Sequence, residues 1–401
     1  MNDTAPMVGA RTAARSAAHP KLLFLVTEDW YFWSHRLPVA RAARDAGFDV
    51  VVATRVGVHG ERIRAEGFRL CPLAWRRRGD GLIGAMRAVA AIIRLYRAER
   101  LDIVHHVALK PVLFGGLAAR LAFPRGKGAP ARLSAVMGLG GGLIRHGALA
   151  GIERHLLGFV LRLAAAGGHV VVQNPEDGAA LAGLGIDRMR VALIRGSGVD
   201  IAHFRPVAEP AGATARIAFV GRMLRSKGVF DAVAAVRRLR ERGVAAELLL
   251  AGSPDPDNRD SLSEADLRAL DGEPGVEWLG RVEDVRTVWQ RAAIAVLPTS
   301  YGEGVPLALL EAAACGRPIV AADTPGCREA VRHGETGLLV RQHDVAALAD
   351  AIAALTADPA RRQAMGEAGR RLVERDFAAP LIAEQTLALY RELLRERADR
   401  R

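Results

Sequence analysis

One segment constrains the fold of this chain more than any other. Residues 299–316, TSYGEGVPLALLEAAACG, lie between two short apolar runs at residues 293–297 and 318–322, which are typical of buried strands. Gly302 and Gly304 allow tight backbone turns, Pro306 suits the first turn of a helix, and good helix formers follow. The segment therefore predicts a loop that leads into a helix near Val305, between two strands of an α/β sheet.

The same segment carries two acidic residues next to an anion-friendly helix start. Glu303 and Glu311 stand eight residues apart, which separates their backbones by about 12 Å along a helix. Paired glycosidase carboxyls lie only about 5 to 9.5 Å apart, so a wider pair suits two ends of one elongated ligand. A helix start after glycines favours anions, and a nucleotide diphosphate sugar offers both hydroxyls and phosphates. The plainer alternative is two solvated charges on one helix.

Length and charge limit the class of protein. The 401 residues are half hydrophobic, which is enough for two domains, and the three cysteines show no metal-like spacing, which favours a reduced cytosolic setting. Residues 1–200 hold 28 basic and 15 acidic side chains, against 28 and 29 in residues 201–401. No nucleic-acid motif accompanies the basic half, so an anionic membrane surface is the expected partner, with a merely solvated basic surface as the alternative.

The chain begins its regular structure with a strand, a helix and a strand at residues 21–26, 37–46 and 49–53. The turn between the first two contains Trp30, Tyr31, Phe32, Trp33, Ser34, His35 and Arg36, and it lacks the glycine fingerprint of dinucleotide-binding folds. His35 and Arg36 suit a phosphate, and the aromatic residues suit an acceptor sugar or lipid. A hydrophobic staple capped by Ser34 is the competing interpretation.

Three further features of the first half have two interpretations each. Residues 82–96 predict an amphipathic helix with Arg87 and Arg94, which fits either a membrane interface or packing on the sheet. His105 and His106 end a strand at residues 102–107, and the segment from Leu109 is expected to begin the following loop. Open sheets bind ligands at such strand ends, although single histidines are usually structural. The glycine run 138–142, with Gly140 and Gly141, predicts an anion-binding nest or a structural turn.

The second half repeats the α/β pattern from residue 217. A strand at residues 217–221 precedes a helix at residues 229–242, and the loop between them holds Arg222 and Lys227. Positive charge at a strand end can stabilise a departing anionic group. The Asp255-Pro256-Asp257 sequence is interpreted as a turn rather than a metal site, because proline and the following Asn258 are turn residues.

The segments EGVPLALLE and AAACGRPIVAADTPGCREAV together resemble family 4 retaining glycosyltransferases with their E-x7-E motif. The resemblance covers nearly the whole chain from residue 21 and is more specific in its second half. It implies the GT-B fold, an α/β architecture of two doubly wound parallel-sheet domains facing across a cleft. The implied divisions are a disordered N-terminus at 1–20, an acceptor domain at 21–205, a nucleotide-sugar domain at 206–379 and a helix at 380–401 that crosses back to the first domain.

The resemblance also implies a role for each matching residue. Glu303 would bind the donor sugar, Arg222 and Lys227 its diphosphate, and His105 would contact the sugar. Glu311 would bind the ribose, the Gly304 and Val305 amides the phosphate, and Gly280 with Arg281 the base. His35, Arg36, Gly140 and Gly141 would lie on the acceptor side. Neither a metal nor another cofactor is expected, since fixed positive charges would neutralise the diphosphate.

The expected activity is transfer of a hexose or N-acetylhexosamine from a UDP-sugar, with retention, to a polyprenyl-diphosphate-linked or other glycan acceptor. The expected process is surface polysaccharide synthesis, and the expected location is the cytoplasmic face of the inner membrane, as a peripheral protein. A nucleotide-sugar epimerase of the same fold is one alternative, disfavoured by the E-x7-E motif. A catalytically silent binding subunit is another, disfavoured because Arg222, Lys227 and Glu303 are all present.

Overall fold

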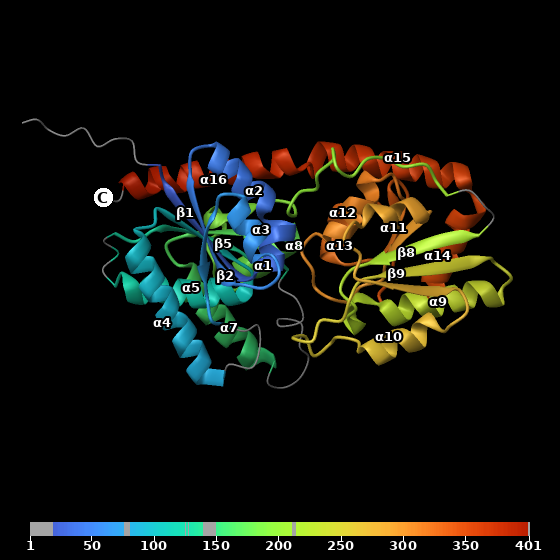
Figure 1. Cartoon of the computed structure of the whole chain (residues 1–401), viewed down its shortest axis with the longest axis horizontal. Helices are drawn as coiled ribbons and strands as arrows, with labels where there is room; N and C mark the ends of the chain where they lie inside the picture. The colour runs from blue at the N-terminus through green and yellow to red at the C-terminus, as the bar shows by residue number, and fades with distance from the viewer. Residues whose placement is uncertain are drawn as a thin grey trace, which may run out of the picture.

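The computed structural model describes residues 19–75, 81–124, 126, 128–138, 150–210 and 214–399, and of residues 150–157 the backbone alone. Two parallel sheets, one per domain, organise the chain (Figure 1). The first sheet has the strand order β3-β2-β1-β4-β5-β6-β7. Its strands are β1 (Lys21–Glu28), β2 (Asp49–Arg55), β3 (Arg69–Pro72), β4 (Ile103–Val107), β5 (Ala131–Ala135), β6 (His169–Val172) and β7 (Val191–Leu193).

The second sheet has the strand order β10-β9-β8-β11-β12-β13. Its strands are β8 (Ala215–Val220), β9 (Ala246–Ala251), β10 (Val276–Gly280), β11 (Ile294–Leu297), β12 (Ile319–Ala322) and β13 (Gly337–Val340). The strand order reverses between β1 and β4 in one sheet and between β8 and β11 in the other. Such switch points open a crevice at the carboxyl ends of the strands, where ligands bind in open α/β sheets. The predicted pair of doubly wound domains is confirmed.

Helices cover the two faces of each sheet (Figure 1). Those of the first domain are α1 (Asp29–His35), α2 (Leu37–Asp45), α3 (Gly60–Ala65), α4 (Gly81–Glu99), α5 (Leu109–Ala122), α7 (Ala150–Ala165) and α8 (Pro175–Gly183). Those of the second are α9 (Val229–Glu241), α10 (Glu264–Asp271), α11 (Arg286–Arg291), α12 (Leu307–Ala314), α13 (Pro325–Ala330), α14 (Val345–Ala357) and α15 (Pro359–Asp376), and the last helix of the chain is α16 (Ala379–Asp399). Among the described residues, no helix has both the length and the apolar character needed to cross a membrane.

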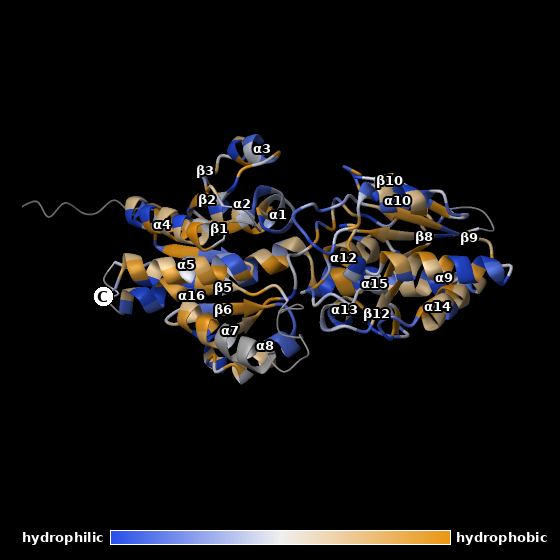
Figure 2. Cartoon of the chain, turned by 90° about the horizontal axis from the view of Figure 1, so that it is seen from below, coloured by the Kyte–Doolittle hydropathy of each residue, from blue (hydrophilic) through white to orange (hydrophobic). Residues whose placement is uncertain are grey.

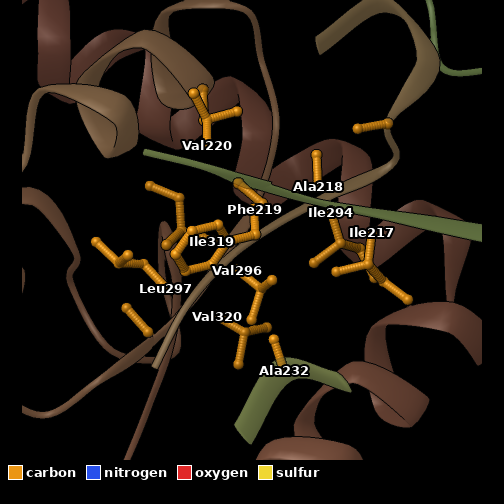
Figure 3. Packing of buried hydrophobic residues seen from close by; sticks show 14 of the residues in the cluster. Ile217, Ala218, Phe219, Val220, Ala232, Ile294, Val296, Leu297, Ile319 and Val320 are labelled. Carbon is orange, nitrogen blue, oxygen red and sulfur yellow. The ribbon is translucent and has the colours of Figure 1, made fainter. Parts of the chain in front are cut away.

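Apolar strands buried on both sides build the cores, as parallel sheets require (Figure 2). Along β1, Leu22 and Phe24 join the cluster that contains α2 and α16, whereas Leu23 and Leu25 join the cluster of α4 and α5 on the opposite face. Figure 3 shows the equivalent packing in the second domain, where apolar side chains of β8, β11 and β12 interlock. Because successive side chains of a strand point to opposite faces of the sheet, each strand packs against one layer of helices on each face.

The chain crosses between the domains twice, and the two crossings are hydrogen-bonded to each other. The Val199 amide donates to the Phe377 carbonyl at 2.9 Å, and the Ala379 amide donates to the Val199 carbonyl at 2.9 Å. Beyond this point α16 packs along α2 of the first domain (Figure 1). The C-terminal helix thus belongs to the packing of the N-terminal sheet.

Three local predictions were wrong. The aromatic turn contains the helix α1, because Phe32 is buried between Phe24 and Phe68 at ring-centroid distances of 5.7 and 6.1 Å. The segment that starts at Leu109 begins the helix α5 rather than a loop. Helix α12 starts at Leu307, two residues later than expected, because the preceding Pro306 has an extended backbone with ψ of 116°.

Candidate functional site

A cavity of about 750 Å³ lies between the domains, and both switch points open into it. Val26, Thr27 and Glu28 line it at the end of β1, and Val107 at the end of β4. From the second domain the lining comes from the ends of β8 and β11, the loop 301–306 and the first turns of α12. We call this cavity the cleft.

The loop before α12 is held on both sides by backbone contacts. The Ser300 and Tyr301 amides donate to the Ser226 carbonyl at 2.8 and 3.1 Å. On the other side Gly326 has no room for a side chain, since a Cβ there would lie 1.6 Å from the Gly304 carbonyl oxygen. The loop is therefore fixed by the β8–α9 connection and by α13.

Two cations from the β8–α9 connection line the cleft, and each meets a carboxylate. Lys227 Nζ lies 3.0 Å from Glu303 Oε1, and only 12% and 15% of these two side chains is exposed. Arg222 donates to Asp255 at 2.8 Å, and its guanidinium lies 6.0 Å from the centre of the Trp30 ring of the first domain. The structure thus places Arg222, Lys227 and Glu303 in one cleft.

Glu311 also lines the cleft, from the middle of α12. Its carboxylate has no hydrogen-bond or ion-pair partner among the described residues. Burial alone raises the pKa of Glu311 to about 8. A desolvated, unpaired carboxyl is a strong acceptor for ligand hydroxyls once it ionises.

On the opposite wall His35 and Arg36 occupy the corner between α1 and α2. The His35 ring lines the cleft, stacked on Tyr31 at a centroid distance of 4.2 Å. Burial, together with the Arg36 and Lys227 charges, lowers the pKa of His35 to about 3, which leaves the ring neutral at neutral pH. Arg36 lies deeper, is 5% exposed, and donates to Met137 Sδ at 2.9 Å.

Both sheet domains match known families. Residues 214–358 match the family described as "Glycosyl transferases group 1", and residues 21–126 match "Glycosyl transferase 4-like". The chain belongs to the family 4 glycosyltransferases. The first of these matches contains Arg222, Lys227, Glu303 and Glu311, and the second contains His35 and Arg36.

Curated relatives of this glycosyltransferase chain differ in how much they share with it. The α-maltose-1-phosphate synthase of Mycolicibacterium smegmatis is 37% identical over 187 residues, which are 44% of this chain and 48% of the relative. The chain thus spans about half the length of that relative. The N,N'-diacetylbacillosaminyl-diphospho-undecaprenol α-1,3-N-acetylgalactosaminyltransferase of Campylobacter jejuni is 25% identical over 374 residues, which are 90% of this chain and 95% of the relative.

Solved structures of low sequence identity share the GT-B fold. Sucrose-phosphate synthase from Thermosynechococcus elongatus superposes with a TM-score of 0.78 at 23% identity, covering 94% of this chain and all of that one. Anabaena HepE, in complex with UDP and glucose, superposes with a TM-score of 0.74 at 17% identity, covering 92% of this chain and 99% of that one.

His105 does not fit the sugar contact that the family resemblance implies. It is 2% exposed, does not line the cleft, and its Nδ1 lies 2.6 Å from the Tyr390 hydroxyl of α16. The reason is strand alternation, which turns His105 toward α16 and His106 toward Tyr96 of α4, whose hydroxyl lies 2.8 Å from His106 Nε2. His105 therefore lies away from the cleft in this structure, and its contact with the sugar stays a prediction.

Two other residues predicted from the glycosyltransferase pattern, Gly280 and Arg281, lie apart from the cleft. Gly280 ends the edge strand β10, and neither it nor Arg281 lines the cavity. Gly140 and Gly141 lie outside the described residues. Of the predicted phosphate amides, the Val305 N–H points to the first domain, where it donates to Gln173 Oε1 at 2.9 Å.

Sequence reasoning missed two partners of the predicted residues. Asp255 was assigned to a turn, and it is the carboxylate that holds Arg222. Gln173 was not singled out in the sequence, and its side chain reaches across to the loop before α12. The available signal for Gln173 was its position, a polar residue at the carboxyl end of a parallel strand.

Proposed function

We propose that the chain is a retaining glycosyltransferase that moves a hexose or N-acetylhexosamine from a UDP-sugar to a glycan acceptor. The observation that carries this proposal is the pairing of Lys227 with Glu303 in a cleft that also holds Arg222 and an unpaired Glu311. Two cations suit a diphosphate, and two separate carboxyl groups suit hydroxyls at the sugar and at the ribose.

In the proposed reaction, the bond between the anomeric carbon and the diphosphate oxygen breaks, and its electron pair leaves with UDP. The acceptor hydroxyl forms the new bond to the anomeric carbon on the same face, and its proton passes to the departing phosphate. Arg222 and Lys227 stabilise the negative charge that develops on the diphosphate. Positioning and charge stabilisation then supply catalysis without a side-chain nucleophile or a metal.

We propose a polyprenyl-diphosphate-linked glycan as the acceptor, in cell-surface polysaccharide synthesis. The Campylobacter relative, which this chain matches along 95% of its length, is named for transfer to a diphospho-undecaprenol-linked sugar. Arg36 supports the proposal from the structure, because its guanidinium is buried and its hydrogen bond goes to a thioether rather than a carboxylate. A phosphate is a better partner for a buried guanidinium than sulfur is.

A lipid-linked acceptor calls for a membrane-facing surface, and we propose α4, α5 and α7 for it, on the cytoplasmic face of the inner membrane. These helices pack side by side (Figure 1). They expose large apolar side chains: Leu82, Ile83 and Met86 on α4, Leu109, Leu117 and Leu121 on α5, and Phe159, Val160 and Leu163 on α7. Arg87, Arg94 and Arg97 on α4, Arg120 on α5 and Arg162 on α7 are exposed beside them. Apolar side chains flanked by arginines suit a bilayer with anionic headgroups.

The activity is tested with a panel of UDP-, GDP- and dTDP-sugars in the presence of EDTA. A UDP-sugar should raise the melting temperature of the wild type and fail to do so for Glu311→Ala. With a polyprenyl-diphosphate-linked acceptor, NMR of the product should show the anomeric configuration of the donor. Release of a free isomer without any acceptor would instead identify an epimerase, and the absence of any nucleotide-sugar binding would indicate a silent subunit.

The membrane surface is tested by co-sedimentation with phosphatidylglycerol vesicles at low salt. The double variant Leu82→Asp and Ile83→Asp should bind less well, because both side chains are mostly exposed, at 79% and 67%, and would place charge at the bilayer. Met189→Asp is the matched control, since Met189 is 87% exposed but lies outside these helices. Equal binding by both variants, together with efficient use of a soluble acceptor, would contradict the membrane proposal.

A further inference from the structure

The two domains touch at the loop before α12, where the family resemblance implies a contact between backbone amides and a donor phosphate. Gln173 follows β6 of the first domain, is 3% exposed, and lines the cleft. Its Oε1 accepts a hydrogen bond from the Val305 amide at 2.9 Å. The carbonyl oxygen of this side chain therefore occupies the position that a phosphate oxygen would take on that amide.

The backbone of the loop packs tightly against the first domain around this hydrogen bond. A Cβ added to Gly304 would lie 1.9 Å from Gln173 Oε1, and a Cβ added to Gly138 of the first domain would lie 2.4 Å from the Gly302 carbonyl oxygen. The loop 302–305 is thus pressed directly against the ends of β5 and β6. A phosphate can reach the Val305 amide only if the Gln173 side chain leaves.

The backbone at Gln173 is fixed, which limits how the side chain can leave. The next residue, Asn174, is the N-cap of α8, and its side chain accepts from the Asp177 amide at 2.7 Å. Release of the contact therefore requires rotation of the Gln173 side chain or separation of the domains as whole bodies. In both cases donor binding and the Gln173–Val305 contact exclude each other.

We propose that Gln173 is a positioning residue of the acceptor domain that competes with the nucleotide diphosphate for the Val305 amide and yields it when the diphosphate binds. This inference rests on the proposed assignment of the Val305 amide to the donor. It makes the acceptor domain sensitive to donor occupancy through a single hydrogen bond. The other phosphate ligands are occupied in the same way, Lys227 by Glu303 and Arg222 by Asp255.

The test measures the affinity of the full-length chain for UDP and for uridine by isothermal titration calorimetry. Gln173→Ala removes the competing acceptor, so UDP should bind roughly two- to tenfold more tightly, as expected when binding no longer has to break one hydrogen bond. Gln173→Glu keeps the shape but places a carboxylate on the Val305 amide, so UDP should bind more weakly than to the wild type. Uridine, which lacks phosphates, should bind all three proteins alike.

Glu176→Ala is the matched control, because Glu176 forms a separate contact across the domains, with Arg328 at 3.1 Å. The Glu176→Ala variant should bind UDP with unchanged affinity. If its affinity for UDP rose as much as that of Gln173→Ala, the gain would come from a general weakening of the contact between the domains, and the inference would be overturned. Weaker or unchanged UDP binding by Gln173→Ala would also overturn it. Wild-type protein that binds no nucleotide would instead contradict the proposed function itself.

Discussion

At the residue scale, burial sets the charge of Glu311 and gives it a measurable effect on stability. The raised pKa of about 8, against 4.5 for an exposed glutamate, means that between these pH values the folded chain keeps a proton that the unfolded chain has released. Stability contributed by the neutral carboxyl is therefore full below about pH 4.5 and is lost as the pH rises toward 8. Glu311→Gln lacks this loss, so its unfolding free energy should rise relative to the wild type by up to about 1.4 kcal/mol per pH unit.

Urea unfolding at pH 5, 6.5 and 8 measures this difference. Glu367→Gln, at an exposed position on α15, serves as the control for general effects of pH on the unfolding of both proteins. A Glu311→Gln variant that keeps the same stability relative to the wild type at all three pH values would show that Glu311 is ionised in the folded protein.

The Lys227–Glu303 pair predicts opposite effects for its two members on nucleotide binding. Lys227→Met removes the proposed phosphate ligand and leaves the Glu303 carboxylate without its ion-pair partner, so UDP should bind much more weakly. Glu303→Gln frees Lys227, so UDP should bind at least as tightly, while the transfer rate should fall by about 10²–10³ if Glu303 makes the proposed contact with the sugar. Calorimetry with UDP and turnover with the UDP-sugar separate the two effects. Equal losses of UDP affinity in both variants would contradict these roles.

At the element scale, the glycine contacts around α12 decide where its first turn lies. Gly326→Ala would push a methyl group to 1.6 Å from the Gly304 carbonyl oxygen, which forces the loop before α12 to shift. We expect loss of UDP binding and a stability cost of about 1–3 kcal/mol. Gly183→Ala is the control, because that helical glycine has open space around its Cβ position and its replacement should be neutral or slightly stabilising. Thermal melts with and without UDP compare the two.

Elements with a clear pattern of apolar residues could be predicted from the sequence, whereas elements that depend on tertiary packing could not. Strand β11 is a continuous apolar run, and β8 is one from Ile217 to Val220, so the positions of both follow from composition and turn residues. Helix α1 was missed because aromatic residues are weak helix formers, and the burial of Phe32 against Phe24 supplies what propensity lacks.

The same limit applies to the candidate site. Residues that belong to one motif, such as Glu303 and Glu311, could be chosen from the sequence. The structure brings them to one cleft with Arg222 and Lys227. Their roles stay predictions. His105 and Gln173 could not be assigned from the sequence. The face of the sheet to which His105 points depends on where the alternation of β4 begins, and the hydrogen-bond partner of Gln173 lies 132 residues away in the chain.

At the scale of the whole molecule, the last helix, α16, packs against the first domain. Tyr390 is fully buried against the first sheet, and Arg397 donates to the carbonyl of Ala129 at 3.0 Å and pairs with Asp102. The hydrogen bond between His105 and Tyr390 connects residues 285 positions apart. The folding of the first domain therefore depends on residues at the end of the chain, beyond the second domain.

Tyr390→Phe tests this dependence with little change in shape. It leaves the buried His105 Nδ1 without its partner, so the unfolding free energy of the first domain should fall by about 1–3 kcal/mol. UDP affinity should not change, since neither residue lines the cleft. In the double variant with His105→Phe no unpaired nitrogen remains, so the combined loss should be smaller than the sum of the single losses. Strictly additive losses in urea unfolding would mean that the two side chains stabilise the domain independently and that their hydrogen bond does not hold α16 in place.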